Sequence, residues 1–451
     1  MNAPAYEVNI DGLVGPTHSY GGLSKGNLAS IENAGNISNP KIAALQGLNK
    51  MKQMADYGYR QLILPPHERP HLPTLRALGY TGVDNRIPGK VYQDNPELLY
   101  QYSSAASMFA ANAATATPSI DAADNRLHLT PANKAATPHR IIEAETTLRL
   151  LRTIFPNPTF FTIHPPLPFH PLFHDEGAAN HIRFCTDLRY VGVHLFVYGK
   201  ANEMDDLPEE RIYTPRQTLE AQKAIARSHR LDPSQVVYAM QSTEALNQGV
   251  FHNDLISMGC HDLFIYHELA FENPEAVLDE LKNTFNEICD QPLKTIKVAN
   301  NEIHLKAAIK TYFFNSQIIK LQDGGFVLFC PKQCQNHQDV NKYLTNLLKD
   351  PKSPIADIHY IDLDQSMRNG GGPACLRFST VLTDIELEQV NPNLFLTDKL
   401  YDRLSEWINI HYRDSLKLED LADPSLVDET QEALNVLTQI LDLGRIYDFQ
   451  Q

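Results

Sequence analysis

The chain has 451 residues, of which 43% are hydrophobic and 21% charged, as in ordinary soluble globular proteins. Its formal net charge of −15, without a long basic stretch, argues against a nucleic-acid partner. The opening sequence MNAPAYEVNIDG lacks the features of a signal peptide, and the most apolar run, Val191–Tyr198, is too short to span a bilayer. Its 6 irregularly spaced cysteines do not indicate a disulfide framework. We therefore expect a cytoplasmic protein with reduced thiols.

Strand-like and helix-like segments alternate along the chain, which predicts an α/β or α+β fold. In chain order, the strand-like runs are Tyr6–Val14, Phe160–Ile163, Val193–Tyr198, Val236–Met240, Asp262–Tyr266, Phe326–Cys330, Ile355–Ile361 and Cys375–Val381. The helical patterns are Lys41–Tyr57, Ile141–Ile154, Arg216–Ser228, Pro274–Phe285, Val340–Leu348 and Leu400–Ile410. No low-complexity linker divides the sequence, so we expect a single domain over residues 1–451. The segments show no fixed period that would establish an internal repeat.

A glycine-rich turn precedes one of the cysteines. The sequence SMRNGGGPACLR, residues 366–377, places three glycines and a proline directly before Cys375. Glycine and proline favour a turn that side chains do not obstruct, so a thiol at the start of the following apolar run could meet a ligand. The alternative is a buried structural cysteine, because free cysteine is among the most buried residue types.

The segment GVFHNDLI, residues 249–256, contains a histidine and an aspartate two positions apart. If this segment is a strand, His252 and Asp254 share one face. Histidine can act as an acid or base near neutral pH, and a carboxylate can bind a planar cation through both oxygens. An edge strand with a solvated polar face remains the alternative.

Two adjacent carboxylates, Asp175 and Glu176, lie between histidines in the sequence FHDEGAANH. They could serve a site, or Asp175 could cap the helical run that follows. The chain contains no HExxH motif, and Cys330 and Cys334 have no matching pair of ligands. We therefore expect no metal ion and no cofactor.

The loop Gly21–Ser30 resembles a phosphate-binding loop only superficially, because Asn27 stands where that motif requires lysine. Its backbone N–H groups could still bind an anion, although a surface turn is an equally ordinary role. Further polar candidates are Asn112, the pair His139–Arg140, and Arg216. Taken singly, each is more typical of a helix cap or a solvated charge.

Together these segments are similar to the N-succinylarginine dihydrolase family. The matching pieces, in the family's order and between residue 10 and about 378, are VGPTHSYGGLSKGNLAS, ANAATATPS, TPHR, HDEGAANH, TPRQT, FHNDLI and SMRNGGGPACLR. Two departures are Lys25, where an aromatic residue is more usual, and Phe109, which replaces a tryptophan. Neither removes a catalytic group. Both concern the closure of the loop over a substrate.

The resemblance implies the pentein fold, a five-bladed α/β propeller of ββαβ-type modules with pseudo-fivefold symmetry. It also implies hydrolysis of N2-succinyl-L-arginine to N2-succinyl-L-ornithine, ammonia and carbon dioxide in arginine catabolism by the succinyltransferase pathway. The partner is then this small molecule rather than a nucleic acid or a membrane, and a homodimer stays open.

Residue by residue, the resemblance implies a catalytic set and a set that binds the substrate. The catalytic set is Cys375, His252 and Glu176. The implied substrate-binding residues are Gly21, Gly22, Leu23, Ser24, Lys25, Gly26, Asn27, Leu28, Ala29, Ser30, Asn112, His139, Arg140, Arg216, Asp254 and Asn369.

These residue types suit attack on a guanidinium group, whose carbon is a poor electrophile and calls for a strong nucleophile such as a thiolate. Carboxylates can hold the planar cation, and a histidine can pass protons between the thiol, the leaving ammonia and water. Whether Glu176 orients His252 or binds the substrate stays open at this stage. Rival interpretations are an arginine deiminase or amidinotransferase, a papain-like protease, and a non-catalytic binding protein. The order Glu176, His252, Cys375 disfavours the protease.

Overall fold

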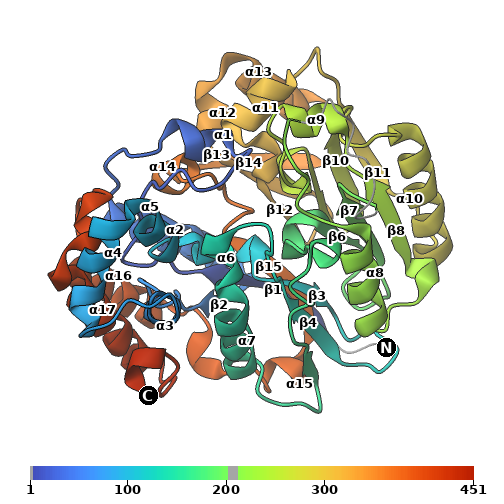
Figure 1. Cartoon of the computed structure of the whole chain (residues 1–451). Helices are drawn as coiled ribbons and strands as arrows, with labels where there is room; N and C mark the ends of the chain where they lie inside the picture. Colours follow the sequence, from blue (N-terminus) through green and yellow to red (C-terminus); the bar gives the residue numbers. More distant parts are fainter. Residues whose placement is uncertain (1–3, 202–211) are drawn as a thin grey trace.

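The computed structural model describes residues 4–201 and 212–451. Within these residues the strands form five three-stranded sheets. Every sheet has the same pairing: its middle strand runs antiparallel to one neighbour and parallel to the other. Helices connect the parallel strands, so the expected ββαβ modules are present (Figure 1). The repeat that the sequence alone did not reveal is therefore a repeat of topology.

The sheets can be followed along the chain from the second module to the fifth. Their strands, in spatial order, are β3 (Ala114–Thr117), β4 (Leu127–Pro131) and β5 (Phe161–Ile163); β6 (His181–Phe184), β7 (Val193–Tyr198) and β8 (Val236–Met240); β9 (Ser257–Cys260), β10 (Leu263–His267) and β11 (Lys294–Val298); and β12 (Gln317–Lys320), β13 (Phe326–Pro331) and β14 (Ile355–Ile361).

The first sheet combines two strands from the start of the chain with one strand from its C-terminal part. It consists of β15 (Arg377–Thr383), β1 (Ala5–Gly12) and β2 (Arg60–Leu64). Strand β15 pairs antiparallel with β1 in a register that sets Arg377 opposite Asp11 and Val381 opposite Glu7. Because the late strand β15 occupies the same place as the first strand of every other module, the ring of modules closes at this sheet.

Helices within the modules cover the outer faces of the sheets. The crossover helices are α2 (Pro40–Asp56), α6 (Pro138–Ile141), α7 (Glu143–Ile154), α8 (Leu219–Ser228), α10 (Pro274–Cys289), α12 (Lys332–Asn336) and α13 (Gln338–Lys349). Their starts follow local chemistry: in α2, the Asn39 side chain accepts a hydrogen bond from the Ile42 N–H, and Pro40 takes the first helical position. Buried Leu48 and Met51 then pack this helix on the core.

Shorter helices fill the connections, and two long helices follow β15. The connecting helices are α1 (Leu28–Glu32), α3 (Leu72–Ala77), α4 (Ile87–Asp94), α5 (Pro96–Tyr102), α9 (Thr243–Asn247), α11 (Leu305–Thr311), α14 (Asp364–Arg368) and α15 (Asp384–Leu387). The last two are α16 (Asp398–His411) and α17 (Pro424–Ile440), and α16 packs against α2. They lie beside the first module in Figure 1. No helix in the described residues combines the length and the apolar character needed to cross a membrane.

A central cavity of about 160 Å³ runs between the modules. Its lining includes residues of β15, β3, β6, β9 and β12. In each three-stranded sheet this is the edge strand that runs antiparallel to the middle strand. These strands also contact one another in the pairs β15–β3, β6–β9 and β9–β12. They are therefore the inner strands of the ring, and the segments that enter them from one side meet at one end of the cavity.

Candidate active site

The candidate residues lie just before the inner strands of their modules. In the described chain, four inner strands are preceded by a short 3-10 turn: η3 (Ala110–Asn112), η5 (Gly177–Asn180), η7 (Asn253–Leu255) and η8 (Phe313–Asn315). The fifth inner strand, β15, is preceded by the glycine-rich turn and Cys375. Equivalent positions of the modules thus carry Asn112, Glu176, the His252–Asp254 segment, Asn315 and Cys375. The topology gathers them from distant parts of the sequence.

At each of the three glycine positions before Cys375, a side chain would overlap a neighbouring residue. Gly370 has a φ of +99°, and a Cβ there would overlap the Asn27 side chain. A Cβ on Gly371 would overlap the Phe109 ring, and one on Gly372 would lie 2.8 Å from Asn315 Oδ1. The Asn27 amide also donates a hydrogen bond to the Gly370 carbonyl at 2.8 Å. The turn is therefore packed from several sides and fixes the position of the thiol.

The Cys375 thiol is buried, with 5% of the residue exposed. Asn315 holds it with both ends of its side chain: its Oδ1 accepts from the Cys375 N–H at 3.0 Å, and its Nδ2 donates to Sγ at 3.1 Å. On the other side the thiol donates to Asp254 Oδ2 at 3.4 Å. Burial and the neighbouring Asp254 carboxylate hold the pKa of the thiol well above its usual value. The thiol is therefore neutral at rest, and a bound cation would help to ionise it.

The surroundings of the Asp254 carboxyl group suit the binding of a cation. Burial raises the pKa of its carboxyl group to about 7, although hydrogen bonds to Cys375 and Asn315 act in the opposite direction. Its Oδ1 is buried and has no hydrogen-bond partner among the described residues. An unpartnered carboxylate oxygen beside a thiol is a suitable acceptor for guanidinium N–H groups.

The segment around Asp254 does not form the strand that the sequence analysis considered. Residues 253–255 form the turn η7, and strand β9 begins only at Ser257. The alternative of a solvated edge strand is also wrong, because His252 is buried and Asp254 is half-buried. The 3-10 turn directs the aspartate to Cys375 and the histidine to Glu176.

Glu176 is the acidic partner of His252. Its Oε2 lies 3.0 Å from His252 Nε2 and 2.6 Å from an Arg140 nitrogen, the latter as an ion pair without hydrogen-bond alignment. Burial alone would raise the pKa of Glu176, but Arg140, His252 and Arg216 together hold it far below its usual value. Because Glu176 is ionised, Nε2 of His252 is the protonated nitrogen and Nδ1 is the basic one.

His252 itself is neutral at rest. Burial lowers the pKa of its imidazole to about 4, against the raising effect of Glu176. Asn112 and Gln217 fix the backbone of Glu176: Asn112 Nδ2 donates to the Glu176 carbonyl, and Gln217 Oε1 accepts from the Glu176 N–H, both at 2.7 Å. The adjacent Asp175 accepts from the Gly177 N–H at 3.1 Å, but it does not cap the turn η5, whose N-cap residue is Glu176 and lacks a side-chain cap.

A second cavity lies against the thiol. Among the predicted residues it is lined by Gly21, Gly22, Leu23, Ser24, Asn27, Ser30, Asn112, His139, Arg140, Arg216, His252, Asn369 and Cys375. Lys25, Gly26, Leu28, Ala29 and Glu176 do not line it, and Asp254 lines the central cavity instead. Phe109 does line this second cavity, whereas Lys25 is exposed. Of the two residues that differ from the family's usual ones, only Phe109 therefore has a side chain that lines the cavity.

Arg216 connects the glycine loop to this cavity. Its guanidinium donates to Ser24 Oγ at 2.9 Å and to the Lys25 carbonyl, and it lies 4.7 Å from the centre of the Phe251 ring. Burial lowers its pKa to about 10, so it remains a cation at neutral pH. Burial and the neighbouring Arg140 and Arg216 lower the pKa of His139 to about 3. The cavity therefore combines two neutral imidazoles with two arginines, of which Arg140 is paired with Glu176 and Arg216 can attract an anionic group.

Sequence reasoning missed several residues of the site. Asn315 is the most important, since it is the only described side chain with hydrogen bonds to both the N–H and the thiol of Cys375. Phe251 and Gln217 were also passed over. The signal that could have found Asn315 is its place before an inner strand, and that place becomes visible only once the five modules are aligned.

Among solved structures, the N-terminal domain of ArgZ with bound product, an arginine dihydrolase from cyanobacteria, is similar in fold. The structural alignment covers 83% of this chain and 97% of the ArgZ domain, with 13% sequence identity and a TM-score of 0.50. The expected pentein fold is confirmed. At this identity the likeness defines the class of fold and not the reaction.

The family follows from the sequence comparisons. The family model described as succinylarginine dihydrolase matches residues 4–450. Curated relatives named N-succinylarginine dihydrolase come from Marinobacter nauticus (48% identical over 446 residues, 99% of each chain) and from Burkholderia ambifaria (47% over 447 residues, 99% of this chain and 100% of the relative). The chain belongs to the succinylarginine dihydrolase family, as its motifs predicted, and the family's members are hydrolases.

The first testable consequence concerns Asn315. Asn315→Ala removes the donor to Sγ and the acceptor for the Cys375 N–H, so kcat/KM should fall about 10–150-fold, the worth of a hydrogen bond to a charged group. Asn315→Asp keeps the acceptor but places a second anion beside the thiol, so it should be at least as poor. Steady-state kinetics with Tm as a folding control measures both. A near-wild-type Asn315→Ala enzyme would contradict this role.

The second consequence is a pH dependence. The pKa of the Asp254 carboxyl group is raised to about 7 by burial, so the group is neutral below that pH and anionic above it. Because a cation binds the anion, kcat/KM should increase as the pH rises through about 7. Asp175 serves as the control, since Asp175→Asn keeps the acceptor for Gly177 and should leave this limb unchanged. A flat profile between about pH 6 and about pH 8 would exclude Asp254 as the cation ligand.

Proposed function

We propose that the chain hydrolyses N2-succinyl-L-arginine with two waters to N2-succinyl-L-ornithine, two ammonia and carbon dioxide, with Cys375 as the nucleophile. The observation that supports the residue roles is the buried thiol held between Asn315 and Asp254. Family membership supplies the substrate. We further propose that the chain acts as one catalytic domain, since the family model extends over nearly its whole length.

The guanidinium group binds against Asp254. Its N–H groups donate to the unpartnered Oδ1, and its positive charge offsets the repulsion between the Asp254 carboxylate and a thiolate. The cation thereby lowers the cost of ionising Cys375 only when substrate is present. This arrangement keeps the thiol inert in the free enzyme and brings sulfur to the reacting carbon in the complex.

His252 carries the protons in this mechanism. The thiol proton passes to Nδ1 while Glu176 stabilises the imidazolium through Nε2. Sulfur adds to the guanidinium carbon, and the tetrahedral adduct collapses as His252 returns the proton to the departing ammonia. Water then adds to the amidino-thioether carbon, His252 accepts its proton, and the C–S bond breaks to give the ureido product and the free thiol. Glu176 is thus a positioning residue for His252.

The ureido product undergoes a second addition and elimination, in which the reacting group is neutral and proton transfer from the thiol to His252 has no help from a substrate cation. The thiol adds to the ureido carbon, a second ammonia leaves, and the enzyme holds an S-carbamoyl group bonded to the ornithine nitrogen. Water releases this group as a carbamate, which decomposes to carbon dioxide and the free amine. Atoms balance with two waters consumed, and no redox partner is required.

Arg140, Arg216 and the glycine loop are placed to bind the other end of the substrate. That end carries carboxylates, and both guanidinium groups line the cavity beside Cys375. Ser24 and Arg216 already contact each other, so a bound carboxylate would join the loop to the rest of the cavity. The net negative charge of the protein does not oppose this binding, because the cavity presents two arginines.

A test of the nucleophile is Cys375→Ala. Removal of one sulfur at the edge of the cavity should abolish turnover and leave the fold intact, as judged by Tm. The matched controls are Ala substitutions at the remaining cysteines, which should leave activity largely in place: Cys185, Cys260, Cys289, Cys330 and Cys334. Appreciable turnover by Cys375→Ala would rule out the covalent mechanism.

The reaction itself is tested by counting ammonia. N-succinylarginine should release two ammonia for each succinylornithine formed, whereas a deiminase would release one and stop at the ureido product. Free arginine lacks the anionic tail and should be a poor substrate, by about 10–150-fold for each lost charge-assisted hydrogen bond. Efficient release of a single ammonia from free arginine would move the assignment to a deiminase.

A further inference from the structure

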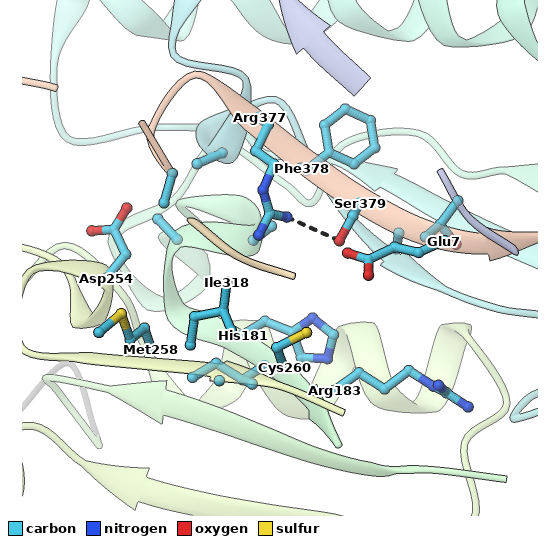
Figure 2. Close-up of a pocket in the computed structure, with 18 of the residues that line it drawn as sticks. Glu7, His181, Arg183, Asp254, Met258, Cys260, Ile318, Arg377, Phe378 and Ser379 are labelled. Atoms are coloured by element: carbon cyan, nitrogen blue, oxygen red, sulfur yellow. Dashed lines mark hydrogen bonds between the residues drawn. The ribbon is translucent and has the colours of Figure 1, made fainter. Parts of the chain in front are cut away.

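The central cavity has two chemically different ends. One end is lined by Asp254 and Ala374, beside the nucleophile, and the other reaches Glu7 and His261. Figure 2 shows Asp254 and Glu7 on opposite sides of this cavity, with Arg377 between them. Glu7 pairs with Val381, four residues along β15 from Arg377, so about 13 Å of extended strand separates Glu7 from the start of β15 beside the Cys375 turn.

At the far end, three side chains with metal-binding groups converge. Glu7 on β1, Cys260 at the end of β9 and His261 in the following turn offer a carboxylate oxygen, a sulfur and a ring nitrogen that all lie within 4.8 Å of one another. In Figure 2, Cys260 lies on the Glu7 side of the cavity, away from Asp254. Thiolate, imidazole and carboxylate are the ligand types that zinc takes in proteins, with three protein ligands and one open position in many sites.

His261 is placed for such a role by the backbone. It occupies a two-residue turn between Cys260 and Leu263, which pair across the β9–β10 hairpin, and its φ is +53°. The turn puts consecutive ligands, Cys260 and His261, next to each other at the rim. The ring Nδ1 is buried and has no hydrogen-bond partner among the described residues. A buried nitrogen without a partner carries a cost that a metal bond would remove.

Most of the charged side chains around the three ligands are paired. Arg183 is bound to Asp121 by two hydrogen bonds. Lys320 and Lys294 share Asp262, at 2.8 and 2.7 Å. Arg377 is a further nearby cation, and its Nη1 donates to Ser379. Glu7 is therefore the carboxylate that would offset the charge of a bound ion.

We propose that Glu7, Cys260 and His261 form a binding site for a thiophilic divalent cation such as Zn²⁺, separate from the catalytic set. The ion would join β1 of the first sheet to the β9–β10 turn of the fourth across the mouth of the central cavity. It takes no part in the hydrolysis, because Cys375 and His252 lie at the other end. Its expected effect is to stabilise the closed ring of modules.

The test uses Co²⁺ as a spectroscopic substitute for Zn²⁺. The full chain carrying Cys375→Ala is titrated, so that the catalytic thiol cannot bind the ion. One equivalent of Co²⁺ should produce a thiolate-to-cobalt charge-transfer absorption, and Zn²⁺ should abolish it by displacement and raise Tm. Cys260→Ser on this background should lose the band. The matched control is Cys185→Ser, which removes another buried thiol from the same cavity and should retain it.

A second variant guards against misfolding of Cys260→Ser. Glu7→Gln keeps the shape of the side chain and should weaken Zn²⁺ binding by more than about tenfold, since even residues that only support ligands contribute about 10–100-fold. The absence of a charge-transfer band in the Cys375→Ala protein would overturn the proposal. So would binding that persists unchanged in both Cys260→Ser and Glu7→Gln, because the ion would then lie elsewhere.

Discussion

The hydrogen bond from the Cys375 thiol to Asp254 joins the proposed nucleophile to the group that would hold its target. Burial raises the pKa of both groups, so that near neutral pH the thiol is protonated and Asp254 is only partly ionised. In the proposed mechanism, a guanidinium ion favours ionisation of the pair. Selectivity for a cationic reacting group and protection of the thiol then arise from the same contact.

The ring of modules makes this contact possible. Segments before the inner strands enter one end of the central cavity, and each module can place a different side chain there. Asn315 enters from the fifth module, Asp254 from the fourth, and Cys375 completes the first sheet from the C-terminal part of the chain. Closure of the ring by β15 is therefore also the step that brings the nucleophile to its partners.

The sequence predicted the long apolar elements well. Val193–Tyr198, Val236–Met240 and Ile355–Ile361 coincide with β7, β8 and β14, and in β7 and β8 the reason is a largely apolar run, which suits a buried strand. The inner strands β3, β6, β9 and β12 were missed, since each is four residues long and so short a segment carries little periodicity. Without them the repeat was invisible, and so was Asn315. Motif resemblance led to Cys375, His252 and Glu176 as candidates, but the hydrogen bonds that these side chains make became visible only with the fold.

The central claim is that Cys375 forms a covalent bond to the guanidinium carbon. The most direct measurement is mass spectrometry of wild-type enzyme that is acid-quenched during turnover. The peptide containing Cys375 should gain the mass of N-succinylarginine less one ammonia, and no other cysteine peptide should change. Product formation without any adduct, or an adduct on a different residue, would contradict it.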